Sequence, residues 1–574
     1  MNATDSGQNS SGVPEKYIIW GLLGILVLLM VATMILASVP PVDRDALTHH
    51  LFVPKLWLKH GGVYEIPEVP FSYYPMNLDL LYTIPLYFGN DIVPKYIHHL
   101  FALLTAWLIH RYLNKRLGYV YGLLGAIFFL SIPIIVKLSI TVYVDLGLVF
   151  FTTASLLLLL HWAEKDFLLR YLLLAGLCCG LAAGTKYNGL ISIFVLTLFV
   201  PMIYQRSAGK DQQSNGRALL FGLVFTVATF VAFSPWLIKN YVLTGNPIYP
   251  LHNSLFQKDQ KPTVADSQST ADEAPSALQQ INSTGSGAFA SRKILYHETW
   301  WQALLLPVRF FIEGQDDNPR FFDGKLTPFL LVLSILAFMF RPSSPQEGLE
   351  KKILLSFALL YFFLTFFQQA LRIRYIVPIV PPLVILSMYG LRGLKDVLGR
   401  RTGGKNVKTP TAAVIVTGIS CLMLGYNMHY LLKQFATVAP LSYLRGEITR
   451  EQYITAYRPE YPAIQYANSL LPPDAKVLCI YLGNRGYYMN FQPVFEQPYD
   501  SSGIFSTFLR LNDQKKDILK LISKKGITHI LLRDDLTGTW FNLLTPQQKT
   551  FISPIFQNLT QPMFKLKGHT LFRI

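Results

Sequence analysis

The sequence predicts an all-α polytopic membrane bundle of about eleven transmembrane helices, followed by a small C-terminal α/β domain. The 574-residue chain is 51% hydrophobic, only 15% charged, and has a mean hydropathy of +0.33, which excludes an ordinary soluble enzyme of this length. Apolar runs of about 17 to 25 residues, each able to cross roughly 30 Å of hydrocarbon, recur up to Leu431. Beyond Leu431, short apolar runs alternate with amphipathic stretches, a pattern typical of an α/β fold.

The predicted spans follow one another through the first three quarters of the chain. They begin near Tyr17, Val93, Tyr119, Val142, Leu168, Leu190, Ala218, Leu326, Ile353, Tyr375 and Thr411. The first run, residues 17–37, is followed by Pro40 and Pro41 in place of a small-residue cleavage site. We therefore expect it to be a retained helix rather than a signal peptide.

Lysine and arginine gather in alternate loops, and this asymmetry predicts the orientation of the chain. With a cytoplasmic N-terminus, the inner loops hold Arg111, Lys115 and Arg116; Lys165 and Arg170; Arg206, Lys210 and Arg217; Lys351 and Lys352; and the basic run 392–408. This arrangement obeys the positive-inside rule and accounts for much of the formal net charge of +17. No nucleic-acid motif accompanies that charge, so we expect no nucleic-acid partner.

The sequence predicts two domains, and the odd number of spans places the second one outside the cytoplasm. Residues 1–431 form the transmembrane domain, with extracytoplasmic loops at 39–92 and 239–325, and residues 432–574 form an extracytoplasmic α/β domain. A polar insert at 257–291 is expected to be a loop, because it is rich in Ser, Thr, Gln and Asp. The prediction is a multi-pass protein of a bacterial inner (plasma) membrane.

Two aspartates stand at predicted outer ends of spans and are candidate catalytic groups. Asp45 lies in "DALTHHLF" after the first span, and Asp145 lies in "YVDLGL" at the start of the fourth. A carboxylate there can take a proton from a hydroxyl or hold a sugar hydroxyl, whereas the alternatives are a helix cap or a solvated interfacial residue. On a helix, His49 shares a face with Asp45 and lines the site, while the adjacent His50 points elsewhere, so no zinc pair is expected.

Four cations on the same predicted side are candidate ligands of a phosphate. They are Lys186 in "GTKYNGL", Lys239 in "PWLIKNYVLTGNPIYP", and Arg372 and Arg374 in "RIRYIVPIVPP". A cation where water is scarce can neutralise a phosphate, although snorkelling or contact with lipid headgroups is the alternative for each. Their neighbours Tyr187 and Tyr375 are expected to line the same site.

Taken together, these segments resemble the GT-C superfamily of polyprenyl-phosphate-sugar-dependent glycosyltransferases. The resemblance is to the family 39-like branch of dolichyl-phosphate-mannose protein mannosyltransferases and the bacterial aminoarabinose transferase of lipid A. It implies that Asp45 matches the first-loop acid, a catalytic base or acceptor-positioning group. It also implies that Asp145 matches the second-loop acid and Lys186 a donor-phosphate ligand. Ala46 stands where many members have a glutamate after the first acid.

The resemblance implies an enzyme that moves a hexosyl or pentosyl group from a polyprenyl-phosphate donor. The acceptor would be a lipid, a glycan or a protein at the extracytoplasmic face, with membrane lipid as a further partner. No cofactor is required by this chemistry, and a divalent metal stays an open alternative. Other readings also stay open: a lipid-linked glycan ligase or polymerase, a membrane transporter or flippase, and a scaffold of this fold without activity.

Overall fold

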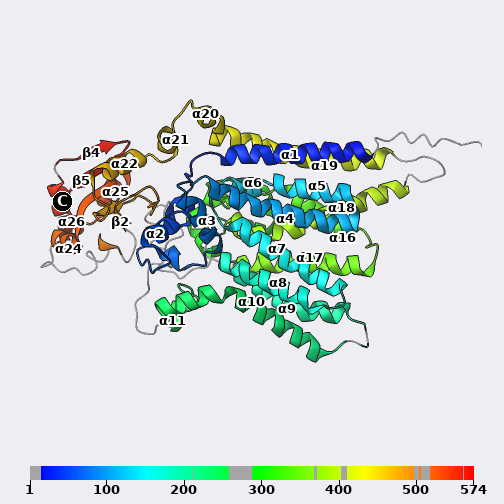
Figure 1. Ribbon diagram of the computed structural model, residues 1–574. Coiled ribbons are helices and arrows are strands. Elements are labelled where there is room, and N and C mark those ends of the chain that lie inside the picture. The colour runs from blue at the N-terminus through cyan, green and yellow to red at the C-terminus, as the bar shows by residue number, and fades with distance from the viewer. Residues whose placement is uncertain are drawn as a thin grey trace, which may run out of the picture.

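The computed structural model describes residues 15–209, 211, 213–256, 288–366, 371–401, 410–496, 503–505, 518–559 and 561–574. The insert at 257–291 lies almost entirely outside these residues, as do Lys210 and part of the basic run 392–408. The described helices form a long bundle, and the C-terminal α/β domain sits at one end of it (Figure 1). We call this end, with its covering segments, the capped end.

Helices occupy all the places where the sequence predicts spans. They are α1 (Glu15–Ala37), α4 (Val93–Leu117), α5 (Tyr119–Ser131), α6 (Pro133–Ser139), α7 (Asp145–Glu164), α8 (Leu169–Thr185), α9 (Gly189–Ser207), α10 (Asn215–Thr244), α16 (Pro328–Met339), α17 (Pro345–Thr365), α18 (Val380–Arg401) and α19 (Pro410–Val438). Within the described residues, six helices are long and apolar enough to cross a membrane, or seven if the bent pair α5 and α6 is one span. The chain is therefore a multi-pass membrane protein, and the number eleven stays a prediction.

The helices pack closely where small residues allow it. Along α8, a Cβ at Gly176 would lie 2.7 Å from the backbone oxygen of Phe225, and one at Gly180 would collide with the backbone of Thr229. Two glycines four residues apart thus let α10 approach α8 at backbone distance, as in other membrane helix pairs. This close packing fixes the end of α8, where Lys186 follows directly.

The segment between α1 and α4 covers the capped end. It contains the π-helix η1 (Ala46–His50), α2 (Phe52–His60), the 3₁₀ turn η2 (Pro70–Tyr73) and α3 (Asn77–Tyr87). Residues 46–50 form a π-helical turn in place of the expected α-helical one. The expected divergence of the two histidines is wrong, since their ring centroids are 4.0 Å apart. Single π-turns of this kind are frequent at functional sites.

The segments that join α10 to α16 and α17 to α18 also lie at the capped end. The first contains α11 (Asn253–Phe256), α13 (Ala288–Tyr296), α14 (Trp300–Leu304), α15 (Leu306–Ile312) and η6 (Pro319–Phe321). The second contains the 3₁₀ turns η7 (Ile373–Tyr375) and η8 (Val377–Ile379). These short elements bring residues of the segment between α10 and α16 next to the residues that precede α18, since the N–H of Ile373 donates to the carbonyl oxygen of Phe322.

The C-terminal domain has the predicted α/β architecture. After α20 (Pro440–Leu444), α21 (Arg450–Tyr457) and α22 (Tyr461–Leu470), five strands form one mixed sheet in the order β2-β1-β3-β5-β4. The strands are β1 (Lys476–Ile480), β2 (Gln492–Glu496), β3 (Ile527–Arg533), β4 (Phe564–Leu566) and β5 (His569–Arg573), and the remaining helices are α24 (Ile518–Lys524), α25 (Asp534–Leu543) and α26 (Pro546–Asn558). β1 is parallel to β2 and β3, whereas β5 is antiparallel to β3 and β4.

Both faces of this sheet are covered, which explains its apolar central strands. Val477 and Cys479 of β1 pack on the side of α22, while Leu478 and Ile480 pack with α24 and α26 on the other side. Successive side chains of a strand point to opposite faces, so a strand buried on both sides reads as a continuous apolar run.

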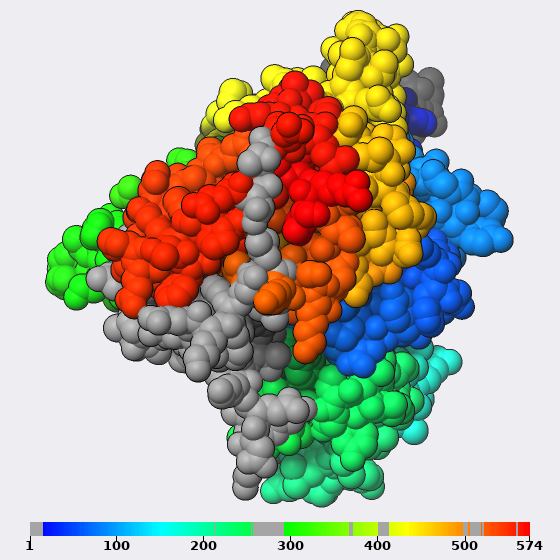
Figure 2. All heavy atoms as spheres, turned by 90° about the vertical axis from the view of Figure 1, so that its left-hand side faces the viewer, coloured from blue at the N-terminus to red at the C-terminus, as the bar shows by residue number. Residues whose placement is uncertain are grey.

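The C-terminal domain is docked on the segment between α1 and α4. Lys55 Nζ donates hydrogen bonds to the carbonyl oxygens of Tyr487 and Met489, at 2.8 Å each. Arg450 pairs with Asp91 at 2.5 Å. Figure 2 looks on to the capped end and shows the domain, in orange to red, beside the blue first segment. The domain is thus held by charged and carbonyl contacts and forms part of the surface above the bundle.

Candidate functional site

A cavity of about 1080 Å³ lies at the capped end between the bundle and the C-terminal domain. Its walls come from segments spread along the chain, which include the start of the first outer segment, residues 134–143, residues 316–324, residues 372–374 and the C-terminal domain. Three predicted site residues line it: Asp45, Arg372 and Arg374. Because the walls come from segments more than 500 residues apart, only the folded chain forms this space.

Asp45 and Arg374 form an ion pair on the wall of the cavity. The Arg374 guanidinium donates to Asp45 Oδ2, and both side chains are mostly buried. Burial alone would raise the pKa of Asp45, but the charge of Arg374 holds that pKa well below its ordinary value. Burial likewise favours neutral Arg374, but the Asp45 carboxylate raises the pKa of Arg374 above its ordinary value. Asp45 is therefore ionised at neutral pH, and Arg374 remains a cation.

Asp145 and Lys186 form a second ion pair, 2.6 Å between Lys186 Nζ and Asp145 Oδ1. Asp145 is the first residue of α7 and is buried, and its Oδ2 has no hydrogen-bond partner. Tyr375 joins the two pairs, since its ring centroid is 5.2 Å from Lys186 Nζ and 5.3 Å from the Arg374 guanidinium carbon. The predicted residues Asp45, Asp145, Lys186, Arg374 and Tyr375 are thus brought together.

Arg372 points to another part of the same cavity. Its Nη1 donates to Asp323 Oδ2 at 3.1 Å. The backbone N–H of Ile373, which lies between the two arginines, donates to the carbonyl oxygen of Phe322 at 2.8 Å. Residues 322–323 therefore fix the backbone that carries both arginines.

The other predicted site residues lie away from the cavity lining. Lys239 Nζ donates to the carbonyl oxygen of Ser72 at 2.7 Å, so it binds the first outer segment. The hydroxyl of Tyr187 donates to the carbonyl oxygen of Tyr249 at 2.8 Å. His49 stacks on Phe71 at 4.5 Å, and burial lowers the pKa of His49 to about 3. Their roles as substrate-binding groups stay predictions.

The structure adds acidic residues that the sequence analysis did not single out. Asp316 lines the cavity and accepts from Tyr430 at 2.5 Å and Gln434 at 3.4 Å, while its Oδ1 is buried without a partner. Asp79 contacts His50 Nδ1 at 2.7 Å, and burial raises the pKa of Asp79 to about 7. The cluster "GQDDNPRFFDGK" around Asp316, directly before the span predicted to begin near Leu326, was the available signal.

No group of three or more His, Cys, Asp or Glu side chains within the described residues could hold a metal ion. Two carboxylates of the cavity are paired with arginines, Asp45 with Arg374 and Asp323 with Arg372. The chemistry of this wall suits the binding of an anion next to an ionised carboxylate.

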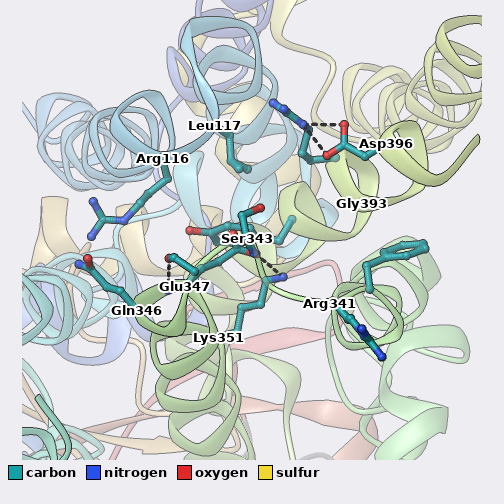
Figure 3. Close-up of a pocket in the computed structure, with 13 residues that line it drawn as sticks. Arg116, Leu117, Arg341, Ser343, Gln346, Glu347, Lys351, Gly393 and Asp396 are labelled. Carbon is teal, nitrogen blue, oxygen red and sulfur yellow. Dashed lines mark hydrogen bonds and ion pairs between the residues drawn. The ribbon is translucent and has the colours of Figure 1, made fainter. Parts of the chain in front are cut away.

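A smaller cavity of about 270 Å³ lies at the opposite end of the bundle (Figure 3). Its wall includes Lys351 paired with Glu347 at 2.6 Å and Arg392 paired with Asp396 at 3.0 Å. Arg116 also lines this space. The sequence places these residues in loops predicted to be cytoplasmic, and the structure puts them at the end farthest from the C-terminal domain (Figure 1).

The sequence and the fold of this chain are similar to those of known proteins. Residues 86–238 match the family model of dolichyl-phosphate-mannose-protein mannosyltransferase. No curated protein sequence matches the chain significantly. ArnT from Cupriavidus metallidurans in the apo state is similar in structure, with a TM-score of 0.57, 13% sequence identity, and coverage of 96% of this chain and 97% of that chain.

Two further solved structures are similar. ArnT from the same organism bound to undecaprenyl phosphate has a TM-score of 0.55 at 12% identity and covers 98% of each chain. The archaeal oligosaccharyltransferase AglB from Archaeoglobus fulgidus has a TM-score of 0.50 at 14% identity, covering 97% of this chain and 74% of that one. The predicted fold is confirmed: this chain shares the fold of ArnT over almost its whole length, and residues 86–238 match the mannosyltransferase family model.

Proposed function

We propose that this chain is an integral membrane glycosyltransferase that transfers a sugar from a polyprenyl-phosphate donor to an acceptor hydroxyl. The Asp45–Arg374 pair on the wall of the large cavity carries this proposal, because it places an ionised carboxylate and a fixed cation side by side. The fold supports it: the similar ArnT was solved with undecaprenyl phosphate, and AglB with an inhibitory peptide and a dolichol-phosphate.

The reaction requires one bond to form and one to break. The acceptor oxygen attacks the anomeric carbon, and the bond from that carbon to the phosphate oxygen breaks, with the electron pair leaving on polyprenyl phosphate. The acceptor proton passes to a carboxylate, for which Asp45 is the candidate. Its low pKa means that Asp45 is always deprotonated and ready to accept a hydrogen bond from the hydroxyl.

The leaving phosphate is stabilised by positive charges that are already in position before the bond breaks. Arg374 is held in place by Asp45, and its Nε is buried without a partner, which leaves a donor for a phosphate oxygen. Lys186, whose Nζ lies 5.2 Å from the centroid of the Tyr375 ring, supplies a second positive charge. Fixed donors aimed at developing charge are the strongest contribution that a protein makes to such a displacement.

The direct test is transfer by the purified full-length protein in nanodiscs, with a set of radiolabelled polyprenyl-phosphate sugars and with lipid, glycan and protein acceptors. We expect one donor to give a labelled product and release polyprenyl phosphate. Product formed only on lipid-linked glycans would identify a ligase or polymerase. In sealed proteoliposomes, movement of label across the bilayer without bond cleavage would identify a transporter and overturn the proposal.

We also propose that the capped end faces the extracytoplasmic side, most simply of a bacterial inner membrane, as the Lys and Arg distribution predicts. Single cysteines placed at Lys567, in the C-terminal domain, and at Arg341, at the opposite end, test this with a membrane-impermeant maleimide on intact cells. Both side chains are exposed. Labelling at 567 and protection at 341 is the expected result, and the reverse pattern would place the site in the cytoplasm.

A further inference from the structure

An apolar stripe runs along α14 and α15, outside the cavity. Trp300 and Trp301 are 64% and 57% exposed, and their rings stack with centroids 3.6 Å apart. Four more large apolar side chains follow at helical spacing and are also exposed: Leu304, Leu305, Val308 and Ile312. Six such side chains on one face form a far larger exposed patch than scattered surface residues give.

The opposite face of the same segment is already buried in the protein. Leu306, Phe310 and Phe311 pack into the main core of the bundle. A helical segment that is apolar on both faces needs a second apolar environment for the outward one. No part of the chain that the structure describes provides it, because the six side chains remain exposed.

The neighbouring helix indicates what covers the stripe. α15 packs against α16, whose outward side chains Val332, Ile335 and Met339 are exposed in the same way. α16 is an apolar helix of the bundle, so these side chains face lipid. The stripe is therefore continuous with a lipid-facing surface, and it lies at the capped end, where α16 begins. Paired tryptophans at the end of a membrane helix are typical of the interface between headgroups and acyl chains.

We infer that α14 and α15 form an interfacial anchor that lies in the lipid layer at the capped end and holds the arginine-bearing wall of the cavity. The stripe contacts lipid, while the buried side of α15 also carries Arg309, which contacts Phe322 next to the cavity wall.

The link from the anchor to the wall is a compact buried cluster. Arg309 of α15 and Arg292 of α13 both donate to Glu298 Oε1, at 3.0 and 2.7 Å. Both guanidinium groups lie over the ring of Phe322, at 5.5 and 4.6 Å. The carbonyl oxygen of Phe322 then accepts from the N–H of Ile373 at 2.8 Å. A continuous set of contacts thus joins the lipid-facing helix to the residue between Arg372 and Arg374.

Tryptophan fluorescence tests the anchor without any assumption about catalysis. The chain has eight tryptophans, so the emission of the pair is obtained as the difference between wild type and the Trp300→Phe, Trp301→Phe double variant. The full-length protein is placed in nanodiscs of phosphatidylcholine with brominated acyl chains. We expect the pair to be quenched by shallow bromines more than by deep ones, and to be protected from aqueous iodide.

Two other tryptophans serve as controls for this measurement. Trp20 of α1 is 70% exposed on the first span and should also be quenched by brominated lipid, whereas Trp540, buried in the C-terminal domain, should not. Quenching of the pair by iodide and not by brominated lipid would overturn the inference. Protection from both quenchers would also overturn it, because a second protein surface would then cover the stripe.

The holding role is tested separately and depends on the proposed function. Trp300→Ser with Trp301→Ser should weaken binding of undecaprenyl phosphate to the nanodisc-embedded protein by about three- to tenfold, while Trp20→Ser leaves it unchanged. Unchanged binding in the double variant, with normal binding by wild type, would refute the holding role. If wild type itself binds no polyprenyl phosphate, the proposed function fails, whereas the quenching result still decides the anchor.

Discussion

The two ends of the bundle both concentrate charged side chains, but they use them differently. At the opposite end, Arg116 donates from Nε and Nη2 to both oxygens of Glu350, at 2.9 and 2.6 Å, and also pairs with Glu164. Tyr112 donates to Glu350 as well, at 2.6 Å. None of the charged atoms in this cluster is buried without a partner. This cluster ties α4, α7 and α17 together, and the adjacent space is small (Figure 3).

At the capped end, the charged groups are only partly satisfied. Asp145 Oδ2, Arg374 Nε and Asp316 Oδ1 are all buried without a hydrogen-bond partner. Two of these residues, Arg374 and Asp316, line the larger cavity, and Asp145 pairs with Lys186. A buried polar atom without a partner costs about 1 to 3 kcal/mol. Such atoms in native proteins often contact water, an ion or a ligand, so the comparison supports the proposed binding site at the capped end, whereas the cluster at the opposite end is a structural clamp.

The largest expected effect is at Asp45. Asp45→Asn keeps the size of the side chain but removes the proton acceptor, and we expect transfer to fall by roughly 10²- to 10⁴-fold. The initial rate with a radiolabelled donor measures this, and size-exclusion elution with the melting temperature shows that the variant is folded. Near-normal turnover would reduce Asp45 to a structural partner of Arg374 and remove the distinction between the two ends.

Lys186 should affect donor affinity. Lys186→Met removes a charge-assisted contact worth about 1.5 to 3 kcal/mol, so we expect binding of polyprenyl-phosphate sugar to weaken by roughly tenfold to a hundredfold. Lys186→Arg should restore part of it. Because Lys186 pairs with Asp145, the matched control is Asp145→Asn combined with Lys186→Met, which leaves no unpaired carboxylate. Equal affinity in wild type and both Met variants would show that the phosphate is held elsewhere.

At the opposite end, a substitution should lower the stability of the protein and leave the rate of transfer unchanged. Glu350→Gln removes the carboxylate that Arg116 and Tyr112 share, and we expect a loss of about 1 to 3 kcal/mol in the free energy of unfolding. Thermal unfolding in nanodiscs measures this loss. The rate of transfer per folded molecule should stay as in wild type, and a large fall in that rate would mean that the clamp also serves the reaction.

The smallest effect concerns pH. The pKa of Asp45 is depressed in the folded state, so its ion pair contributes stability above its unfolded pKa of about 3.9 and loses it only as pH falls through the lower folded pKa. The difference in melting temperature between wild type and Asp45→Asn should therefore be constant from about pH 8 to pH 5. A difference that disappears near pH 6 would show that the Asp45 pKa is raised, contrary to the ion pair with Arg374.

The sequence by itself determined the membrane class, the positions of the bundle helices and the α/β character of the tail. These follow from local patterns, since a run of apolar residues of sufficient length has few stable environments other than a bilayer. It also singled out Asp45, Asp145, Lys186 and Arg374 as candidates, because a charge at the end of an apolar run needs a partner or a cavity.

Only the tertiary structure decided which of these charges meet. Asp45 and Arg374 are 329 residues apart, and nothing in either local pattern selects that pair over one with Lys239, which binds Ser72 instead. The π-helical turn after Asp45 and the contact of Asp316 with Tyr430 could not be predicted either, because both depend on contacts between distant segments. Local hydrophobicity fixes where helices form, whereas the partners of buried charges depend on how those helices pack.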